Sequence, residues 1–475
     1  MQNYKFYYFL LSFLISLLFL LKYEYNYFYF LCLSIVCNGY FIFSFSTNAQ
    51  LFHLFNSFFL WMGFWFKIII VNIFFNNQFN ELNHDAFNYL IFYDQSILVS
   101  IIGIAGFFCS LILNLLFLPF KYPQKKTFSQ IIATDFFNNY KNYILILFLI
   151  AVLIINYFNF NYFIYQKGIE SNENINSLIL VIFKWLLLFG LASFSSLIIY
   201  HSILKQTLSI RVLLVVLFEN FITSISLLSR GMFINFMGII FGVFKYNQYL
   251  KINNLKKNIL FVISLFIILF LISLYFVTDL RSKKYFEIDP SVDKSIVQKE
   301  NIYDNSKAHG REIFRLIAHR FVGFESVLAI SSFKNKNFDF LKSSFSTMSD
   351  SNKSFSDVIK NENFNDNQSP KEHTYFIKVP GIIAFLYYSG SLLFVFFVCF
   401  FLGIMLTYFE KFIVRFSNGN LIFAALISQT LAYRLSSFGH MPQNTYLLII
   451  TILFNLLIIY LFYFFLIKSK QYNEH

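Results

Sequence analysis

Long runs of apolar residues alternate with short polar segments along almost the whole chain. A helix needs roughly 17 to 25 residues to cross the hydrocarbon core of a bilayer, and runs of about this length predict about twelve transmembrane helices. Only a short polar step near Ser229 separates two of them. The expected spans are residues 6–21, 27–46, 51–75, 96–119, 142–159, 178–200, 210–228, 231–245, 259–277, 381–406, 419–437 and 445–466.

One polar segment, residues 278–380, is much longer than every other break between apolar runs. It divides the chain into an N-terminal helical region (1–277, about nine spans), the long loop itself, and a C-terminal helical region (381–475, about three spans). The two helical regions show no internal repeat. This disfavours a transporter built from two related halves, in which the substrate site lies between the repeats.

The composition supports an all-α polytopic membrane protein. Hydrophobic residues make up 57% of the chain and charged residues only 13%, whereas soluble domains contain about 25% charged residues. The net charge of +13 resides mostly in short loops, so we interpret it as a signal for orientation and expect no nucleic-acid partner. The four cysteines lie in expected spans without zinc spacing. The first apolar run lacks a cleavage site, so we expect it to be retained as a span.

The basic residues of the short loops predict the orientation. Alternate loops carry most of them, and the opposite loops carry few, together with Glu81, Asp85 and Asp94. We therefore expect cytoplasmic termini, an extracytoplasmic loop at 278–380, and Arg230, Arg434 and His440 at the same outer border. The residues assigned to the cytoplasmic side are Lys121, Lys125, Lys126, Lys141, Lys205, Arg211, Lys245, Lys251, Lys256, Lys257, Lys411, Arg415, Lys468 and Lys470.

Within the long loop, a helical period predicts an amphipathic helix near residues 311–331. Its apolar face carries Ile313, Ile317, Phe321, Phe324 and Leu328, and its basic face carries Arg311, Arg315 and His319. Such a helix is typical of a surface that faces lipid headgroups, and it is equally suited to binding an anionic substrate.

Arg320 differs from the other basic residues because it projects from the apolar face. A guanidinium in such a place needs a carboxylate or phosphate partner, so either a structural ion pair or a diphosphate ligand is expected. Glu325 is close in sequence but lies well round the helix, unless Gly323 breaks the helix and changes this geometry.

Further polar groups lie at or near the outer border. Arg230 follows a span that also contains Glu219, which we interpret as a structural partner of Lys67 or Lys184, or as a residue lining a cavity. Residues 380–391 open a later span with Tyr387 and Tyr388. Arg434 and His440 lie at the next outer turn, where a histidine is suited to accept a proton or is simply interfacial.

Several chemistries lack their motifs. The sequence contains no phosphate-binding glycine loop, no dinucleotide fingerprint, no nucleophile elbow and no H-E-x-x-H. The long loop has no paired acidic motif of the D-x-D kind, so a metal-held nucleotide-sugar donor is not indicated. We therefore expect neither a metal nor a cofactor.

With these residues in view, the chain resembles the Wzy-type polymerases of bacterial O-antigen and capsular repeat units. The resemblance is carried by LLSRG at 227–231, HRFVGFES at 319–326 and PGIIAFLYYSGS at 380–391, together with the number of spans and the long outer loop late in the chain. It implies a GT-C-like architecture in the bacterial inner membrane. It also implies partners: undecaprenyl-diphosphate-linked oligosaccharides, the lipid bilayer, a chain-length regulator and a flippase.

The resemblance implies glycosyl transfer between two lipid-linked glycans, in which cations stabilise the departing diphosphate. The first candidates for this role are Arg230, Arg315, Arg320 and Arg434. Arg281 and Arg311 are secondary candidates. Candidates for the base that accepts the hydroxyl proton are His319, Glu325 and His440. The alternatives are an O-antigen ligase, a flippase or transporter of lipid-linked oligosaccharide, and a structural or sensory protein whose loop binds a partner.

Overall fold

The computed structural model describes most of the chain, with gaps. The described residues are 2–21, 23, 25–46, 48–75, 89–117, 119, 128–166, 175–205, 208–249, 252, 255–288, 321–333, 335–346, 381–439 and 442–473. Every regular element in these ranges is a helix. The fold is therefore the all-helical one that the composition predicts.

Eight helices in the described ranges are long and apolar enough to cross a membrane, so the chain is a polytopic membrane protein. They are Tyr27–Ser44, Leu51–Phe75, Tyr93–Phe117, Lys141–Tyr162, Ser177–Leu204, Lys257–Val277, Leu392–Phe416 and Thr445–Phe465. Shorter apolar helices occupy Tyr7–Leu20, Met232–Asn247 and Leu421–Ser436, where further spans were expected. The larger number of twelve stays a prediction.

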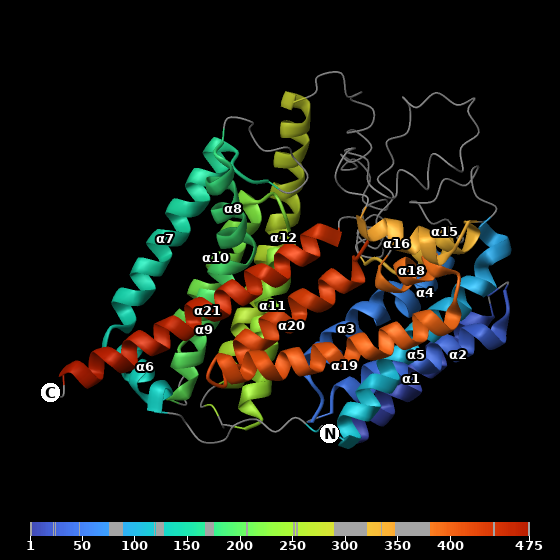
Figure 1. Cartoon of the computed structure of the whole chain (residues 1–475), viewed down its shortest axis with the longest axis horizontal. Coiled ribbons are helices and arrows are strands. Elements are labelled where there is room, and N and C mark those ends of the chain that lie inside the picture. Colours follow the sequence, from blue (N-terminus) through green and yellow to red (C-terminus); the bar gives the residue numbers. More distant parts are fainter. Residues whose placement is uncertain are drawn as a thin grey trace. The chain divides into compact units, whose positions relative to one another are not determined.

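The helices form two compact units. The first unit comprises Met1–Lys121, Tyr303–Glu410 and Leu431–Leu448. Its helix α2 lies beside α5, and α1 lies beside α2 (Figure 1). The elements that lie wholly within it are α1 (Gln2–Leu20), α2 (Tyr27–Ser44), α3 (Leu51–Trp61), η1 (Met62–Phe66), α4 (Lys67–Phe75), η2 (Tyr89–Phe92), α5 (Tyr93–Phe117), α15 (Phe324–Ser332), α16 (Phe338–Ser346), α18 (Ile382–Leu386) and η4 (Tyr387–Ser389).

The second unit comprises Tyr122–Ile302, Lys411–Thr430 and Ile449–His475. Its helix α10 packs against α7, α9, α11 and α12. The elements that lie wholly within it are α6 (Phe128–Asn139), α7 (Lys141–Tyr162), α8 (Ser177–Trp185), η3 (Leu186–Gly190), α9 (Leu191–Leu204), α10 (Ile210–Ser226), α11 (Met232–Asn247) and α12 (Leu255–Ile288). Helices α19 (Leu392–Phe416), α20 (Leu421–Ser436) and α21 (Pro442–Asn473) each contribute residues to both units.

The polar step near Ser229 forms the turn between α10 and α11. Leu228 adopts a left-handed backbone conformation with φ of 49°, and the Ser229 amide donates to the Ser224 carbonyl at 2.9 Å. This 6→1 hydrogen bond ends α10 in a Schellman motif. The break expected between spans 210–228 and 231–245 is confirmed.

The expected span 381–406 is wrong in its bounds. Residues 382–389 form α18 and η4, and the membrane-spanning helix α19 begins only at Leu392. Gly390 has a φ of 71°, a left-handed conformation that glycine adopts without steric cost and that ends the preceding turn. The apolar run therefore contains a short buried helical segment followed by a separate span.

A buried acid fixes the start of α3. The carboxylate of Glu410 accepts hydrogen bonds from the backbone amides of Leu51 at 3.0 Å and Phe52 at 2.8 Å. These amides belong to the first helical turn, where no carbonyl within the helix can accept from them. The negative charge is also favourable at the positive end of the helix.

Candidate functional site

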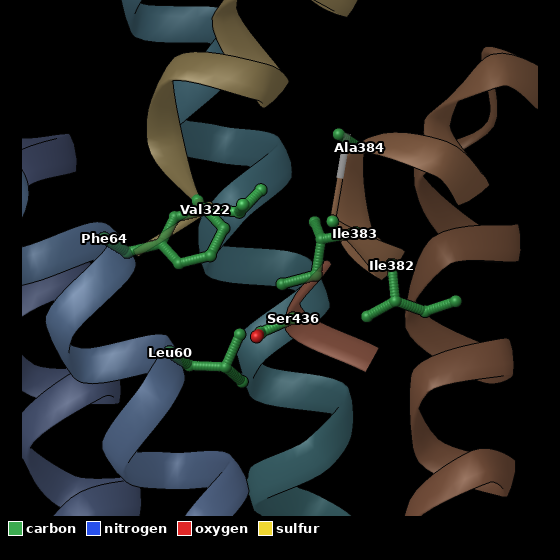
Figure 2. Close-up of a pocket in the computed structure, with 9 residues that line it drawn as sticks. Leu60, Phe64, Val322, Ile382, Ile383, Ala384 and Ser436 are labelled. Carbon is green, nitrogen blue, oxygen red and sulfur yellow. The ribbon is translucent and has the colours of Figure 1, made fainter. Parts of the chain in front are cut away.

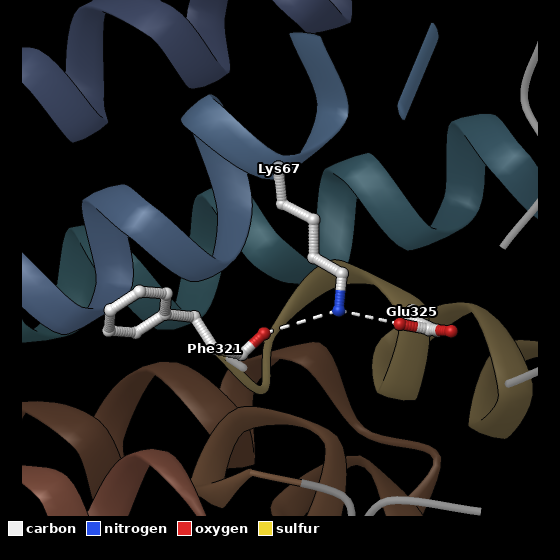
Figure 3. A network of polar contacts seen from close by, with 3 residues as sticks. All are labelled: Lys67, Phe321 and Glu325. Carbon is white, nitrogen blue, oxygen red and sulfur yellow. Dashed lines mark hydrogen bonds and ion pairs between the residues drawn. The ribbon is translucent and has the colours of Figure 1, made fainter. Parts of the chain in front are cut away.

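A buried ion pair joins the long polar segment to the membrane helices of the first unit. Lys67 Nζ lies 2.5 Å from Glu325 Oε2, and the two side chains are only 1% and 4% exposed. The same Nζ donates to the Phe321 carbonyl at 3.2 Å (Figure 3). Lys67 belongs to α4, whereas Phe321 and Glu325 flank the start of α15. A single lysine thus holds both the turn before α15 and its first helical residues.

Two glycines allow the backbones to approach closely enough for this pair. A Cβ atom on Gly63 would overlap the Val322 carbonyl oxygen, and one on Gly323 would overlap the Gly63 carbonyl oxygen. Gly63 lies in η1, a π-helical turn between α3 and α4. Such turns occur frequently at functional sites. The residues 321–323 therefore lie directly on the backbone of a membrane-spanning helix.

Helix α15 begins directly after Gly323, the position where a break was considered. Its residues from Phe324 to Ser331 are all buried. Helices α5, α18, η2 and η4 pack around α15. The basic face predicted for 311–331, with Arg311, Arg315 and His319, lies outside the described residues. Glu325 lies in the first turn of α15, where its charge is favoured by the helix dipole.

Lys336 stabilises the C-terminus of α15. Its Nζ donates to the carbonyls of Ile330 at 3.2 Å, Ser331 at 2.8 Å and Phe333 at 2.5 Å, which caps the last helical carbonyls. It also lies 5.5 Å from the centre of the Tyr387 ring in η4. Burial lowers the pKa of Lys336 to about 8.

Residues 381–390 form a second segment that packs against the membrane helices of the first unit. The Tyr387 hydroxyl accepts a hydrogen bond from Gln95 Nε2 of α5 at 2.7 Å, and burial raises the pKa of Tyr387. A Cβ on Gly381 would lie 2.5 Å from the Ser436 carbonyl oxygen at the end of α20. This segment and α15 therefore form one packed layer against α5.

A small hollow lies where these segments meet (Figure 2). Its walls are Leu60 and Phe64, Val322 and Gly323, Gly381, Ile382, Ile383 and Ala384, and Ser436. Its cavity volume is about 10 Å³, close to the minimum for one water molecule. The hollow is therefore a packing seam and is too small to hold a sugar.

The structure describes only part of the predicted site. Glu325 is in the ion pair with Lys67. Arg434 is half-buried in the last turn of α20 and belongs to the first unit. Arg230 belongs to the second unit, where its Nη2 donates to the Leu274 carbonyl at 3.4 Å. Arg281 lies in α12 without a described side chain. The remaining candidates lie outside the described residues: Arg311, Arg315, His319, Arg320 and His440.

The expected partner of Glu219 is wrong. Lys67 pairs with Glu325, and Lys184 lies over the Tyr165 ring at 5.1 Å from its centre. Glu219 instead accepts hydrogen bonds from the neutral side chains of Ser195, Asn220 and Thr223. Hydropathy shows that Lys67, Lys184 and Glu219 each lie within an apolar run. It does not show which other helix packs beside each of them.

The roles of Lys67 and Lys336 were not predicted. The signal for Lys67 was its isolation in the apolar run 51–75, since a charge within a span usually has a specific partner. No comparable signal marked Lys336 within a polar loop.

Comparisons with known proteins give no relative. No family model, curated protein or solved structure matches the chain.

Proposed function

We propose that the protein is a polymerase that joins undecaprenyl-diphosphate-linked oligosaccharide repeat units into O-antigen or capsular polysaccharide. The observation that carries the proposal is the seam in the first unit, where Val322 and Ser436 line the same hollow. Arg320 precedes Val322 by two residues, and Arg434 precedes Ser436 by two residues. Val322 and Ser436, each two residues after an arginine in the sequence, thus meet at one hollow.

The reaction that we propose needs such a point. The hydroxyl oxygen of the acceptor unit attacks the anomeric carbon of the growing chain, and the bond from that carbon to the diphosphate oxygen breaks. The diphosphate leaves with the bonding electron pair, and the hydroxyl proton passes to a base. Fixed cations lower the barrier because negative charge grows on the leaving group. Arginine suits this task because its planar fork binds two phosphate oxygens.

Arg320 and Arg434 are the first candidates to bind the diphosphate, and Arg230, Arg281, Arg311 and Arg315 are the others. We assign Glu325 to holding the loop through Lys67, because a carboxylate in a buried ion pair is poorly placed to accept a substrate proton. His319 and His440 then remain as candidate bases. The lipid tails would lie among the apolar helices, with the glycan at the outer face of the inner membrane.

Reconstitution tests the proposal. Purified protein in liposomes is supplied with a synthetic undecaprenyl-diphosphate-linked repeat unit, without metal or nucleotide sugar. Products that lengthen by whole repeat units support the polymerase. Transfer to a lipid A-core acceptor alone would identify a ligase. Movement of the unit to the opposite leaflet without a new glycosidic bond would identify a flippase.

A further inference from the structure

A second buried carboxylate lies in the interior of the second unit. Glu219 of α10 is 1% exposed. Its Oε2 accepts hydrogen bonds from Asn220 Nδ2 at 2.7 Å and Ser195 Oγ at 3.3 Å. Its Oε1 accepts one from Thr223 Oγ1 at 3.4 Å. All three donors are neutral, and they come from α9 and α10.

The neighbouring side chains are arranged to donate hydrogen bonds to the Glu219 carboxylate. Asn156 Nδ2 of α7 donates to Thr223 Oγ1 at 3.4 Å, so the Thr223 proton is directed to Glu219. Asn220 uses its amide nitrogen to contact both Glu219 and the Val216 carbonyl. Glu219 is thus an acceptor in each of these bonds, and bonds of this kind stabilise the charged form.

In the described part of the chain, the Glu219 carboxyl group has no basic partner. Among the described residues, no lysine, arginine or histidine forms an ion pair with Glu219. The ion pair of the described residues, Lys67 with Glu325, lies in the first unit. An isolated buried charge is strongly unfavourable in an apolar surrounding, and within membrane helices such a residue marks an ion or substrate site. The carboxyl group can avoid this cost in two ways, by taking up a proton or by binding a cation.

Buried oxygens without a hydrogen-bond partner lie on α10, which carries Glu219, and on α7, which packs beside it. Asn156 Oδ1, Asn220 Oδ1 and Ser224 Oγ are buried and have no hydrogen-bond partner in the described part of the chain. Two of these atoms belong to the amides whose nitrogens bind Glu219 or Thr223. Carboxylate, amide and hydroxyl oxygens are the ligands that hard cations prefer.

The helices that supply these oxygens are braced against each other. Asn159 Nδ2 of α7 donates to Ser226 Oγ of α10 at 2.8 Å, and Ser226 Oγ donates to the Asn156 carbonyl at 3.2 Å. These bonds fix α7 beside α10 and hold Asn156 near Thr223. The oxygens therefore come from a preorganised cluster rather than from independent surface groups.

We propose that this cluster is a binding site for Na⁺. Glu219 neutralises the ion, and the oxygens of Asn156, Ser195, Asn220 and Thr223 complete its shell. A single carboxylate matches a single positive charge, whereas a divalent ion would leave a net charge buried. The site binds a monovalent cation in the second unit, and it does not depend on the polymerase proposal.

Ion-dependent unfolding tests this site. The purified full-length protein is heated in NaCl or in choline chloride at equal ionic strength, and tryptophan fluorescence reports Tm. A ligand that binds only the folded state raises Tm. Well above its Kd, the increase in Tm grows with the logarithm of the ligand concentration. We expect Na⁺ to raise the Tm of the wild type and to leave the Tm of Glu219→Gln unchanged. Equal Tm values of the wild type in both salts would overturn the proposal.

The matched control is Glu410→Gln, which alters a buried carboxylate bound to backbone amides in the first unit. It should keep the full response to Na⁺, and loss of the response there would show that the effect is not local to Glu219. If Glu219→Gln does not fold, a second variant tests the site. Binding of ²²Na⁺ is then measured for the wild type and for Thr223→Val. We expect at least tenfold weaker binding in Thr223→Val, and unchanged binding would overturn the assignment.

Discussion

Lys67 Nζ and Glu325 Oε2 lie 2.5 Å apart in an ion pair that is almost wholly buried. The pair connects a membrane-spanning helix of the N-terminal region with a short helix that follows the first part of the long polar segment. Its two residues are far apart in the sequence, so the contact ties the loop to the scaffold at one defined point. Removing either charge leaves the other one buried and uncompensated.

The first prediction concerns this pair. Lys67→Met should lower the free energy of unfolding by about 3–5 kcal/mol, because the Glu325 charge loses its partner. The double variant Lys67→Met, Glu325→Leu should recover much of this loss, since it removes both buried charges. Denaturant unfolding of the purified protein measures both effects. A double variant with the summed loss of the two single variants would contradict a direct pairing.

The second prediction concerns the contact between Gly63 and Gly323. Gly323→Ala places a Cβ on the Gly63 carbonyl and should destabilise the protein by about 1–3 kcal/mol or more, because the backbone itself has to move. Gly39→Ala is the matched control in the same unit. Its Cβ would meet only Phe108 ring atoms at 3.4 Å. Thermal unfolding compares the two, and equal Tm values would argue against the close approach.

The third prediction concerns the titration of Lys336. Burial lowers its folded-state pKa to about 8, below the value of about 10.4 for a lysine in an unfolded chain. Between these values the unfolded state binds more protons, so this group makes the fold more stable as pH rises from about 8 towards 10.4. The rate at which Lys336 is acylated, measured by mass spectrometry over a range of pH, should rise with a midpoint near pH 8. A midpoint near 10 would contradict the burial of its amine.

The fourth prediction concerns the orientation of the long loop. In a cysteine-free background, Ser351→Cys should react with a membrane-impermeant maleimide added from outside. Ser469→Cys, close to the C-terminus, should react only after the membrane is permeabilised. Both expectations follow from the basic residues of the short loops. The opposite pattern would place the loop in the cytoplasm, where the acceptor of the proposed reaction is not presented.

The fifth prediction concerns the charge at the proposed diphosphate site. Arg434→Lys should reduce polymerisation by about 100-fold or more, because one fixed donor to the leaving group loses its forked geometry. Arg415→Lys, at an exposed position in the last turn of α19, is the control and should keep full activity. The rate of chain lengthening in liposomes measures both. An Arg434→Lys enzyme with the rate of the control would remove Arg434 from the site.

Hydropathy predicted the helices well because the period and length of an apolar run depend on nearby residues alone. The spans 51–75 and 27–46 correspond closely to Leu51–Phe75 and Tyr27–Ser44. The split of 381–406 was missed because a single residue, Gly390, adopts a backbone conformation that composition does not indicate. Helix α6 was missed because its sequence is too polar and too short to resemble a span.

The candidate site was harder to predict because its contacts join distant parts of the chain. The unusual features of Lys67 and Glu219 are visible in the sequence, yet the sequence gives no distance between them. Their partners depend on which helices lie side by side. The structure pairs Lys67 with Glu325 and surrounds Glu219 with neutral donors. The sequence thus indicates which charges need partners, but neither lysine considered for Glu219 pairs with it in the described residues.

The most direct test of the proposed function is the stoichiometry of the leaving group. Purified protein in liposomes, with the lipid-linked repeat unit as sole substrate, is assayed for free undecaprenyl diphosphate and for new glycosidic bonds. We predict one undecaprenyl diphosphate released for each bond formed, without metal or nucleotide sugar. Protein that is folded in the liposomes and yet releases no undecaprenyl diphosphate, or forms no bond, would contradict the account.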